Sequence, residues 1–453
     1  MAGAQPFTLG LNEAAARIRD KSLSPVELTE SCLTRIERLE PLLQAWAFID
    51  RGSALRSAQE LEREQREGRS RGPLHGVPIG IKDIFHTAGL PTRAGAPCLF
   101  DFTPDFDAAA VERLRNAGAI ILGKTTTAEF AALDPAATRN PWNLEHTPGG
   151  SSSGSAAAIA ARMCAAAIGS QTGGSTIRPA SYCGIVGLKA AFGRISCYGA
   201  IELTHSMDHV GIFARSVADA ALMLQVLAGH DPRDPLSSQQ PVPDFIRAVE
   251  NICQPPRIGL LRGAFVDNAS EEVREHVRQV AERAAKAGAR IEELNPPASF
   301  EQVGEAFLTM LSAEAAAFHQ QRFEKHANKY GPKLRGIIER GLAASAVQYI
   351  RACEVQRRFR MDAMTLLDDV DVLLTPASPT TAPKGLGSTG DYIFNAPWSF
   401  SGMPAIGLPS GIAGDGLPLA IQLVGSLFAE ERLLAVARWC EAVLDFSQAP
   451  MIS

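Results

Sequence analysis

Apolar residues recur at helical spacing near the start of the chain. The apolar positions after Ser24 follow one another at about three- and four-residue intervals, and they are Val26, Leu28, Cys32, Leu33, Ile36 and Leu39. The tetrapeptide Ser24–Glu27 has the form of a capping box, with proline at the first helical position. A second helix, predicted over 54–67, carries enough charge to lie on the surface. We therefore expect residues 1–70 to form a helical arm against the core.

From Pro73 onward, short apolar runs alternate with segments of helical pattern. The pattern predicts strands over 119–122, 257–261, 371–375 and 417–424, and helices over 108–116, 156–167, 217–227, 270–287, 301–329, 345–367 and 430–444. Such alternation is typical of an α/β protein with helices on both faces of its sheet.

Composition narrows the class of protein. The chain has 453 residues, of which 46% are hydrophobic and 21% charged, as in ordinary globular proteins. A net charge of −5 gives no indication of nucleic acid or an anionic membrane as partner. No signal peptide opens the chain, and no apolar run is long enough to span a bilayer. We therefore expect no nucleic-acid partner and no membrane association.

The eight cysteines form no CxxC pair. Cys164, Cys183 and Cys440 stand among apolar neighbours, which is typical of reduced, buried thiols rather than disulfides or zinc ligands. This pattern predicts a cytoplasmic protein. The serine–lysine chemistry proposed below needs no metal or other cofactor, and we expect none.

The candidate chemistry lies between Thr147 and Ala180, where two glycine–serine clusters flank an alanine-rich segment. The serines of the first cluster, 149–155, suit the start of a helix, where hydroxyl groups accept hydrogen bonds from unpaired N–H groups. In the second cluster, Gly173 and Gly174 leave consecutive N–H groups unshielded, which favours binding of a developing oxyanion. Ser175, which closes this turn, is a candidate nucleophile.

A serine nucleophile needs a base, and Lys82 is the candidate. It lies in the apolar, strand-like run GVPIGIKDIF, although lysine is rarely buried without a partner. Burial disfavours the ammonium form, so such a lysine can act as a neutral base. The alternative is a lysine at a strand end that reaches solvent. His205, His209 and His230 could also be bases, but each fits a loop or packing position.

Two further segments match known sequence motifs, but their predicted local structure does not fit those motifs. Residues 118–125 fit GxxxxGK[ST], but the four intervening residues AIIL read as a strand, and Lys124 is expected near its end rather than on a phosphate. Ser152 is the central serine of a GxSxG match. A nucleophile elbow requires a strand just before the serine, whereas residues 139–148 read as a loop. We predict neither a nucleotide site nor an elbow.

Several segments together resemble the amidase signature family. They are PLHGVPIGIKD (73–83), GAIILGKT (118–125), TRNPWNLEHTPGGSSSGSAAA (138–158), GSQTGGSTIRPASYCGIVGLK (169–189), HVGIFARSVADAALML (209–224) and the strand and helix around 416–425. The resemblance spans most of the chain in the family's order. It implies an amidase signature fold with one large mixed β-sheet, helices on both faces and an N-terminal helical arm.

The resemblance also implies a single domain over 1–453. Its parts would be the arm (1–70), a catalytic signature core (71–230), a variable region that shapes the substrate channel (231–340) and the C-terminal part of the core (341–453). In some relatives the arm takes part in a homodimer, and the sequence leaves this open here.

Carried over residue by residue, the resemblance implies a Ser-cisSer-Lys triad. Lys82 matches the base, Ser151 the bridging serine that follows a cis peptide bond, and Ser175 the nucleophile. The N–H groups of Thr172, Gly173, Gly174 and Ser175 would form the oxyanion hole. The implied activity is hydrolysis of a small-molecule carboxylic amide through an acyl-enzyme.

This chain departs from the family's usual spelling at three positions. Ser153 replaces a glycine, Gln171 replaces an aspartate, and Arg178 stands three residues after Ser175 rather than two. Malonamidase-like relatives share the spelling QTGGSxIRPA, and in them this arginine binds a substrate carboxylate. The same role for Arg178 is expected here, with a purely structural contact as the alternative.

Two alternatives to a small-amide hydrolase stay open. The chain could be the glutamine amidase subunit of a tRNA-dependent amidotransferase, which would pass ammonia to partner subunits. It could also be a catalytically inactive scaffold of the same fold, although an intact Lys82, Ser151 and Ser175 set argues against that.

Overall fold

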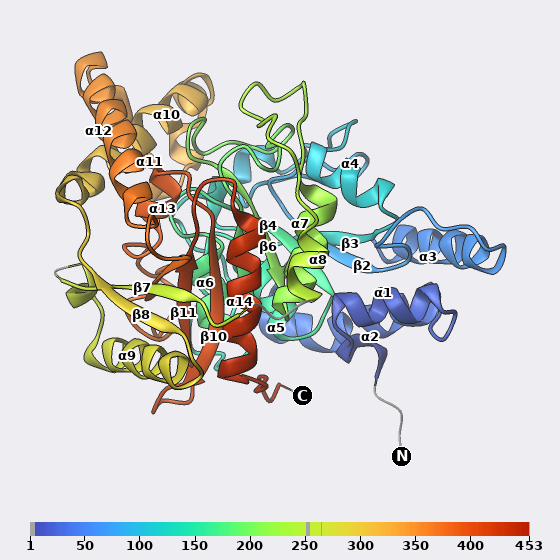
Figure 1. The fold of residues 1–453 in the computed structure, drawn as a ribbon. Helices are drawn as coiled ribbons and strands as arrows, with labels where there is room; N and C mark the ends of the chain where they lie inside the picture. Colours follow the sequence, from blue (N-terminus) through green and yellow to red (C-terminus); the bar gives the residue numbers. More distant parts are fainter. Residues whose placement is uncertain (1–4, 251–253, 264, 453) are drawn as a thin grey trace.

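The computed structural model describes residues 5–250, 254–263 and 265–452. One large sheet runs through the middle of the molecule (Figure 1). Its eleven strands follow the order β1-β3-β2-β4-β6-β5-β10-β11-β9-β7-β8. The strands are β1 (Trp46–Ile49), β2 (Pro78–Lys82), β3 (Ile120–Thr125), β4 (Ala166–Gln171), β5 (Val186–Lys189), β6 (His209–Ala214), β7 (Arg257–Leu261), β8 (Arg290–Leu294), β9 (Val372–Pro376), β10 (Ala405–Ile412) and β11 (Pro418–Val424).

The sheet is mixed. Strand β2 runs parallel to both β3 and β4, and β7 runs parallel to β8 and β9. The other neighbours, from β4–β6 across to β11–β9 and at the β1–β3 edge, pair antiparallel. The predicted large mixed sheet is therefore confirmed.

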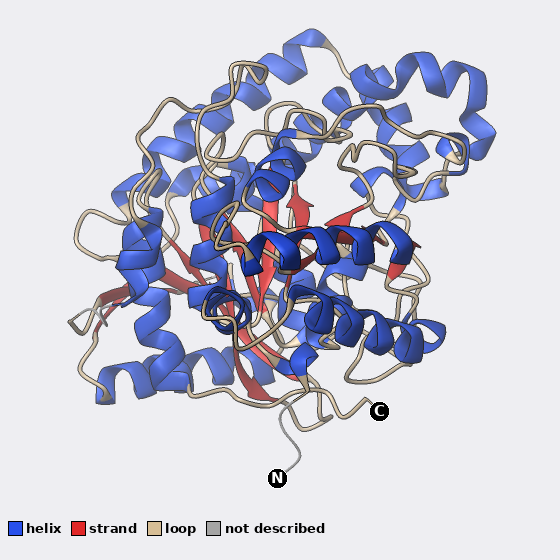
Figure 2. Cartoon of the chain, turned by 90° about the vertical axis from the view of Figure 1, so that its right-hand side faces the viewer, coloured by secondary structure: helices blue, strands red, loops and turns tan. Residues whose placement is uncertain are grey.

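Helices surround this sheet (Figure 2). Helices α7, α8 and α14 contact one another in one layer, while α5 and α6 contact each other in another. The helices are α1 (Leu11–Arg19), α2 (Pro25–Leu43), α3 (Arg51–Arg66), α4 (Ala109–Asn116), α5 (Ser153–Ala160), α6 (Ile177–Cys183), α7 (Val217–Leu227), α8 (Phe245–Glu250), α9 (Glu271–Lys286), α10 (Val303–His326), α11 (Pro332–Ala343), α12 (Ala346–Thr365), α13 (Ala396–Phe400) and α14 (Glu430–Leu444). The predicted α/β class is confirmed.

The helix starts that were predicted from capping residues agree with the structure. The Ser24 hydroxyl accepts hydrogen bonds from the N–H groups of Val26 and Glu27 at the start of α2. Ser270 caps α9, and Ser345 forms a full capping box with Gln348 at the start of α12. These local hydrogen bonds satisfy N–H groups that the first helical turn leaves unpaired.

The alanine-rich segment is only partly helical, so the helix predicted over 156–167 is wrong in its second half. Helix α5 ends at Ala160, Arg162 has a left-handed φ of 58°, and Ala166 begins β4. Strand β4 lies between β2 and β6 with every residue buried. Alanine favours helix in isolation, but here pairing on both sides of the strand outweighs that preference.

The N-terminal arm contains more than helices. Strand β1 lies between α2 and α3 and pairs antiparallel with β3, so this segment forms one edge of the sheet. Its pattern of four residues is too short to predict from apolar spacing. The arm is thereby joined to the core by backbone hydrogen bonds as well as by side-chain packing.

The strand expected within 118–125 is confirmed as β3. The Lys124 side chain is fully buried, and its Nζ donates hydrogen bonds to the carbonyl of Phe85 and the hydroxyl of Thr92. A buried ion pair with Asp83 completes its surroundings. Lys124 thus serves the packing of the core, and residues 120–123 form a strand rather than a loop that could surround a phosphate.

Candidate active site

Lys82 is the last residue of β2 and is fully buried. Its Nζ donates a hydrogen bond of 2.8 Å to the Ser151 hydroxyl and one of 2.7 Å to the Ser170 hydroxyl. Burial lowers the pKa of Lys82 to about 7, and the negative charge of Asp208 opposes this effect. The alternative of a lysine that reaches solvent is therefore wrong.

Ser151 lies two residues before the start of α5, and the Gly150–Ser151 peptide bond is cis, as the family resemblance implied. The neighbouring Ser152 has a different environment. Its hydroxyl lies 3.2 Å from both the N–H and the carbonyl of Ser170, and its side chain is fully buried. The residues before it form turns and no strand, so the rejection of a nucleophile elbow at Ser152 is confirmed.

Residues Thr172–Ser175 form a loop between β4 and α6, which we call the nucleophile loop. In the described part of the chain, the N–H groups of Gly173, Gly174 and Ser175 have no hydrogen-bond acceptor. Three neighbouring N–H groups without a protein partner can stabilise an oxyanion. The Ser175 hydroxyl also has no hydrogen bond within the described residues, and none joins it to Ser151.

Gln171 fixes both ends of the nucleophile loop. Its Oε1 accepts hydrogen bonds from the N–H groups of Thr176 and Ile177 at 2.9 and 3.0 Å. Its Nε2 donates to the hydroxyl of Ser399, which in turn donates to the carbonyl of Gly173. The amide that replaces the family's usual aspartate thus provides an acceptor for the start of α6 and a donor toward α13.

Arg178 lies in the first turn of α6 and is almost fully buried. Its Nη2 group donates to the carbonyl of Gly150 at 2.6 Å and to the hydroxyl of Thr389 at 3.2 Å. Among the described residues, its Nε and Nη1 atoms have no partner, and no acidic side chain pairs with it. The guanidinium stands 5.7 Å from the ring centroid of Tyr392. Two of its nitrogens therefore lack an acceptor among the described residues.

A narrow cavity opens at Ser175. It is lined by Ala131, Ala132, Leu133, Thr172, Gly173, Gly174, Ser175, Arg178, Leu203, Phe307, Leu311, Ile337 and Tyr392. Apolar side chains from α10 and α11 form one side, and the nucleophile loop with Arg178 forms the other. The cavity thus combines an apolar wall with a cation beside the candidate nucleophile.

The three histidines considered as bases all have other partners. The Nδ1 of His209 lies 2.7 Å from the carbonyl of Met207, and burial holds the pKa of His209 well below its usual value. His205 pairs with Glu202, and His230 contacts the carbonyl of Ser237. Each histidine therefore has the loop or packing role that its sequence context indicated.

Two polar residues of the site carry no sequence motif by themselves. Ser170, within β4, is the second hydroxyl bonded to Lys82. Asp208 accepts a hydrogen bond from the hydroxyl of Thr172 in the nucleophile loop. Neither role could be recognised from spacing, because Ser170 lies within β4 and Asp208 directly precedes β6, and the two come together only in the folded sheet.

Within the described ranges, no three or more histidine, cysteine, aspartate or glutamate side chains are grouped as metal ligands would be. A search of the described helices for a membrane span finds none that is both long and apolar enough.

The Amidase family model matches residues 27–434, and the chain belongs to this family. Among curated relatives, a subunit of glutamyl-tRNA(Gln) amidotransferase from Geobacter metallireducens is 36% identical over 470 residues, covering 95% of this chain and 96% of that protein. Among solved structures, native peptide amidase from Stenotrophomonas maltophilia is 31% identical with a TM-score of 0.86, covering 97% of this chain and 98% of its own.

A further solved structure is described as a vestigial protein complex that reveals the evolutionary origins of an s-triazine catabolic enzyme. It is 29% identical to this chain with a TM-score of 0.90, and it covers 98% of this chain and 100% of its own. The expected amidase signature family and its fold are confirmed by these similarities.

Proposed function

We propose that this chain hydrolyses the C–N bond of a small carboxylic amide through an acyl-enzyme on Ser175. The observation that carries the proposal is the hydrogen bond of 2.8 Å between Lys82 and Ser151, made by a fully buried lysine at the end of β2. Membership of the amidase family supports the same reaction class. A metal or organic cofactor has no step to perform in this chemistry, and the reaction needs only protein groups and water.

In the proposed mechanism, neutral Lys82 takes a proton from Ser151, which takes one from Ser175 as its oxygen attacks the carbonyl. The N–H groups of the nucleophile loop stabilise the tetrahedral oxyanion. The protons then return through Ser151 to the nitrogen of the leaving amine or ammonia, and the C–N bond breaks. Water attacks the ester by the same route and releases the acid.

Adduct mapping tests this assignment. A fluorophosphonate should label Ser175, and mass spectrometry of the digested protein should locate the adduct there. Ser175→Ala should remove both labelling and turnover, whereas Ser152→Ala should still be labelled at Ser175. An adduct on Ser152, or full turnover by Ser175→Ala, would refute the proposed nucleophile.

Arg178 supports a substrate that carries a carboxylate near the scissile amide. Its unpartnered Nε and Nη1 atoms lie in a buried side chain that lines the cavity at Ser175. A guanidinium can bind a carboxylate through two parallel hydrogen bonds. The hydrogen bond to Gly150 supports the structural alternative as well, since it holds the segment before Ser151.

A second candidate is the glutamine amidase subunit of a tRNA-dependent amidotransferase. The relatives named as a subunit of glutamyl-tRNA(Gln) amidotransferase, 36% identical over nearly the whole chain, favour it. Glutamine also carries a carboxylate, so the environment of Arg178 is compatible with both candidates. The replacements at Gln171 and Arg178 weigh against it.

Purification of the native protein from its source cells, with and without its copurifying proteins, distinguishes the two candidates. Ammonia or amine release from a panel of small amides by the isolated chain supports the independent hydrolase. Glutamine hydrolysis that appears only with copurified proteins and glutamyl-tRNA supports the second candidate. A cytoplasmic location and a homodimer stay predictions in either case.

A further inference from the structure

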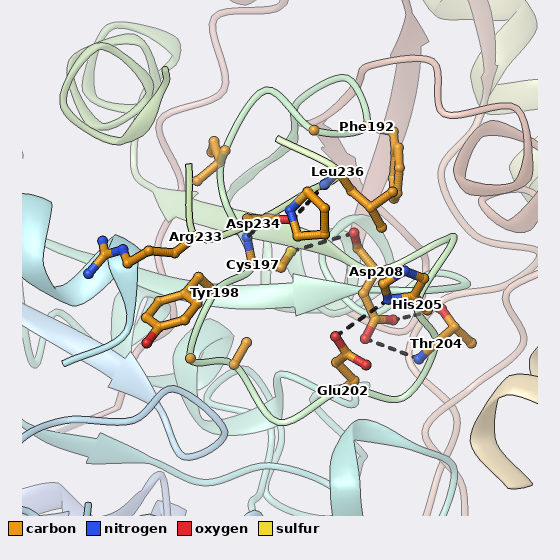
Figure 3. A pocket seen from close by; sticks show the side chains of 15 residues that line it. Phe192, Cys197, Tyr198, Glu202, Thr204, His205, Asp208, Arg233, Asp234 and Leu236 are labelled. Carbon is orange, nitrogen blue, oxygen red and sulfur yellow. Dashed lines mark hydrogen bonds and ion pairs between the residues drawn. The ribbon is translucent and has the colours of Figure 1, made fainter. Parts of the chain in front are cut away.

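A second cavity lies beside the nucleophile loop, between the segment that joins β5 to β6 and the turn at 233–236 (Figure 3). Asp208 is part of its wall, and Figure 3 shows the Asp208 side chain directed toward Thr204. The residue directly precedes β6, whose first residue pairs with Gln171 at the end of β4. Asp208 is thus held next to the start of the nucleophile loop.

The carboxylate of Asp208 accepts hydrogen bonds from two segments. On one side are the N–H groups of Leu203 and Thr204, at 2.8 and 3.2 Å, and the hydroxyl of Thr204, at 3.0 Å. On the other side is the hydroxyl of Thr172. The contact with Thr172 is therefore the one that ties the nucleophile loop to the turn at 203–204.

Burial raises the pKa of the Asp208 carboxyl, whereas the hydrogen bonds from Thr172, Leu203 and Thr204 favour its charged form. In that form Asp208 acts on Lys82 in the direction opposite to burial and raises the pKa of the lysine. The other charged groups around Asp208 are Glu202, which pairs with His205, and Asp234, whose carboxylate accepts from backbone N–H groups. Arg233, at the far side of the cavity, is engaged by Asp231 and Glu112.

We propose that Asp208 is a positioning residue for the amidase reaction, whose carboxylate fixes the nucleophile loop through the hydroxyl of Thr172. This inference rests on the proposed function. The charge and the link separate experimentally, because the charge belongs to Asp208 whereas the link to the loop requires the Thr172 hydroxyl.

Asp208→Asn removes the charge and can keep the shape. The asparagine oxygen can accept from the N–H groups of Leu203 and Thr204, and its amide can donate to the hydroxyl of Thr172. Without the negative charge the protonated lysine is less stable, so the acid limb of kcat/KM should move to lower pH than in the wild type. Glu202→Gln, which removes an acidic charge from the same cavity, should leave the limb where it is.

Thr172→Val removes the hydroxyl and keeps the charge. We expect kcat to fall about tenfold to a hundredfold because the nucleophile loop loses its tie, while the acid limb stays at the wild-type pH. Thr172→Ser, which keeps the hydroxyl, should restore most of the rate. This pair tests the link even if Asp208→Asn fails to fold.

An acid limb that does not move in a folded Asp208→Asn protein would overturn the electrostatic role. Equal rates for Thr172→Val and wild type would overturn the link to the loop. Failure of the proposed function looks different: Lys82→Ala or Ser175→Ala would then retain the wild-type turnover. In that case the pH profile would no longer report on Lys82.

Discussion

At the scale of single residues, burial decides what Lys82 can do. An ammonium group deprived of water is destabilised. Its hydrogen bonds to the hydroxyls of Ser151 and Ser170 replace only part of the lost hydration. The resulting pKa of about 7 leaves a substantial neutral fraction at physiological pH. An ordinary lysine, with a pKa above 10, would be almost entirely protonated under the same conditions.

The first prediction concerns the pH dependence of turnover. Because the neutral lysine is the active form, kcat/KM should rise about tenfold per pH unit below 7 and level off above the pKa near 7. Lys82→Arg should show no turnover, since a guanidinium is not a base in this range. Steady-state kinetics between about pH 5 and pH 9 measure both effects. Near-wild-type turnover of an unactivated amide by Lys82→Arg would mean that another group is the base.

A second prediction at this scale concerns Arg178. Arg178→Ala should lower kcat/KM for a carboxylate-bearing amide roughly tenfold to a hundredfold more than for its neutral analogue, because a charge-assisted hydrogen bond is lost. Arg178→Lys keeps the charge without the planar fork and should recover only part of this difference. An equal loss on both substrates would assign Arg178 to the support of Gly150 alone.

At the scale of elements, β4 connects the two halves of the site. Its interior residue Ser170 contacts Lys82, and Gln171 at its end caps the start of α6. The strand must also approach α5 closely. A Cβ atom at Gly169 would stand 2.6 Å from both the Phe213 ring and the Ser152 hydroxyl. A glycine at position 169 is therefore required by the packing around the candidate site.

The third prediction follows from this close approach. Gly169→Ala should lower the free energy of unfolding by about 1–3 kcal/mol, because the added methyl group forces neighbouring groups apart. It should also reduce turnover, since Ser170 is the next residue. Gly304→Ala is the control: that glycine lies in α10 with nothing within 4 Å of an added Cβ, so alanine should be neutral or stabilising. Urea unfolding measures both variants, and equal stability of the two would refute the packing argument.

Sequence patterns predict the elements that depend on residues close together in the chain. Capped helices such as α2 and α12 are predictable because a serine just before each helix accepts hydrogen bonds from N–H groups of its first turn. Strand β4 was assigned to a helix, because its alanines become a strand only through pairing with β2 and β6. Helix α11 was not predicted as a separate element, although Pro332 stands at its first position.

The residues of the candidate site also fall into those that a motif identifies and those that only the fold brings together. Lys82, Ser151 and Ser175 lie in motifs that could be read, and the structure brings Lys82 and Ser151 into contact. Ser170, within β4, and Asp208, just before β6, take their places in the site only in the folded sheet. Their roles depend on distances that no spacing along the chain encodes.

At the scale of the whole molecule, long-range polar contacts tie the C-terminal part to the catalytic half. Arg194, in the segment between β5 and β6, forms a buried ion pair of 3.1 Å with Glu430 at the start of α14. Both side chains are nearly inaccessible to solvent. The same guanidinium donates to the carbonyls of Pro241 and Phe428, so it joins three separate stretches of chain.

The last prediction tests that connection. Glu430→Gln leaves the buried guanidinium of Arg194 without its counter-charge, which should cost about 3–5 kcal/mol of unfolding free energy. Glu431→Gln, at the next and exposed position of α14, removes the same charge without a buried partner and should change stability by less than about 0.5 kcal/mol. Urea unfolding of both variants gives the comparison.

The same pair of variants also tests the link to the candidate site. Because the segment that contains Arg194 also carries Asp208 beside the nucleophile loop, Glu430→Gln should lose activity at lower urea concentrations than Glu431→Gln. Equal midpoints would show that the carbonyl partners alone hold Arg194 in place.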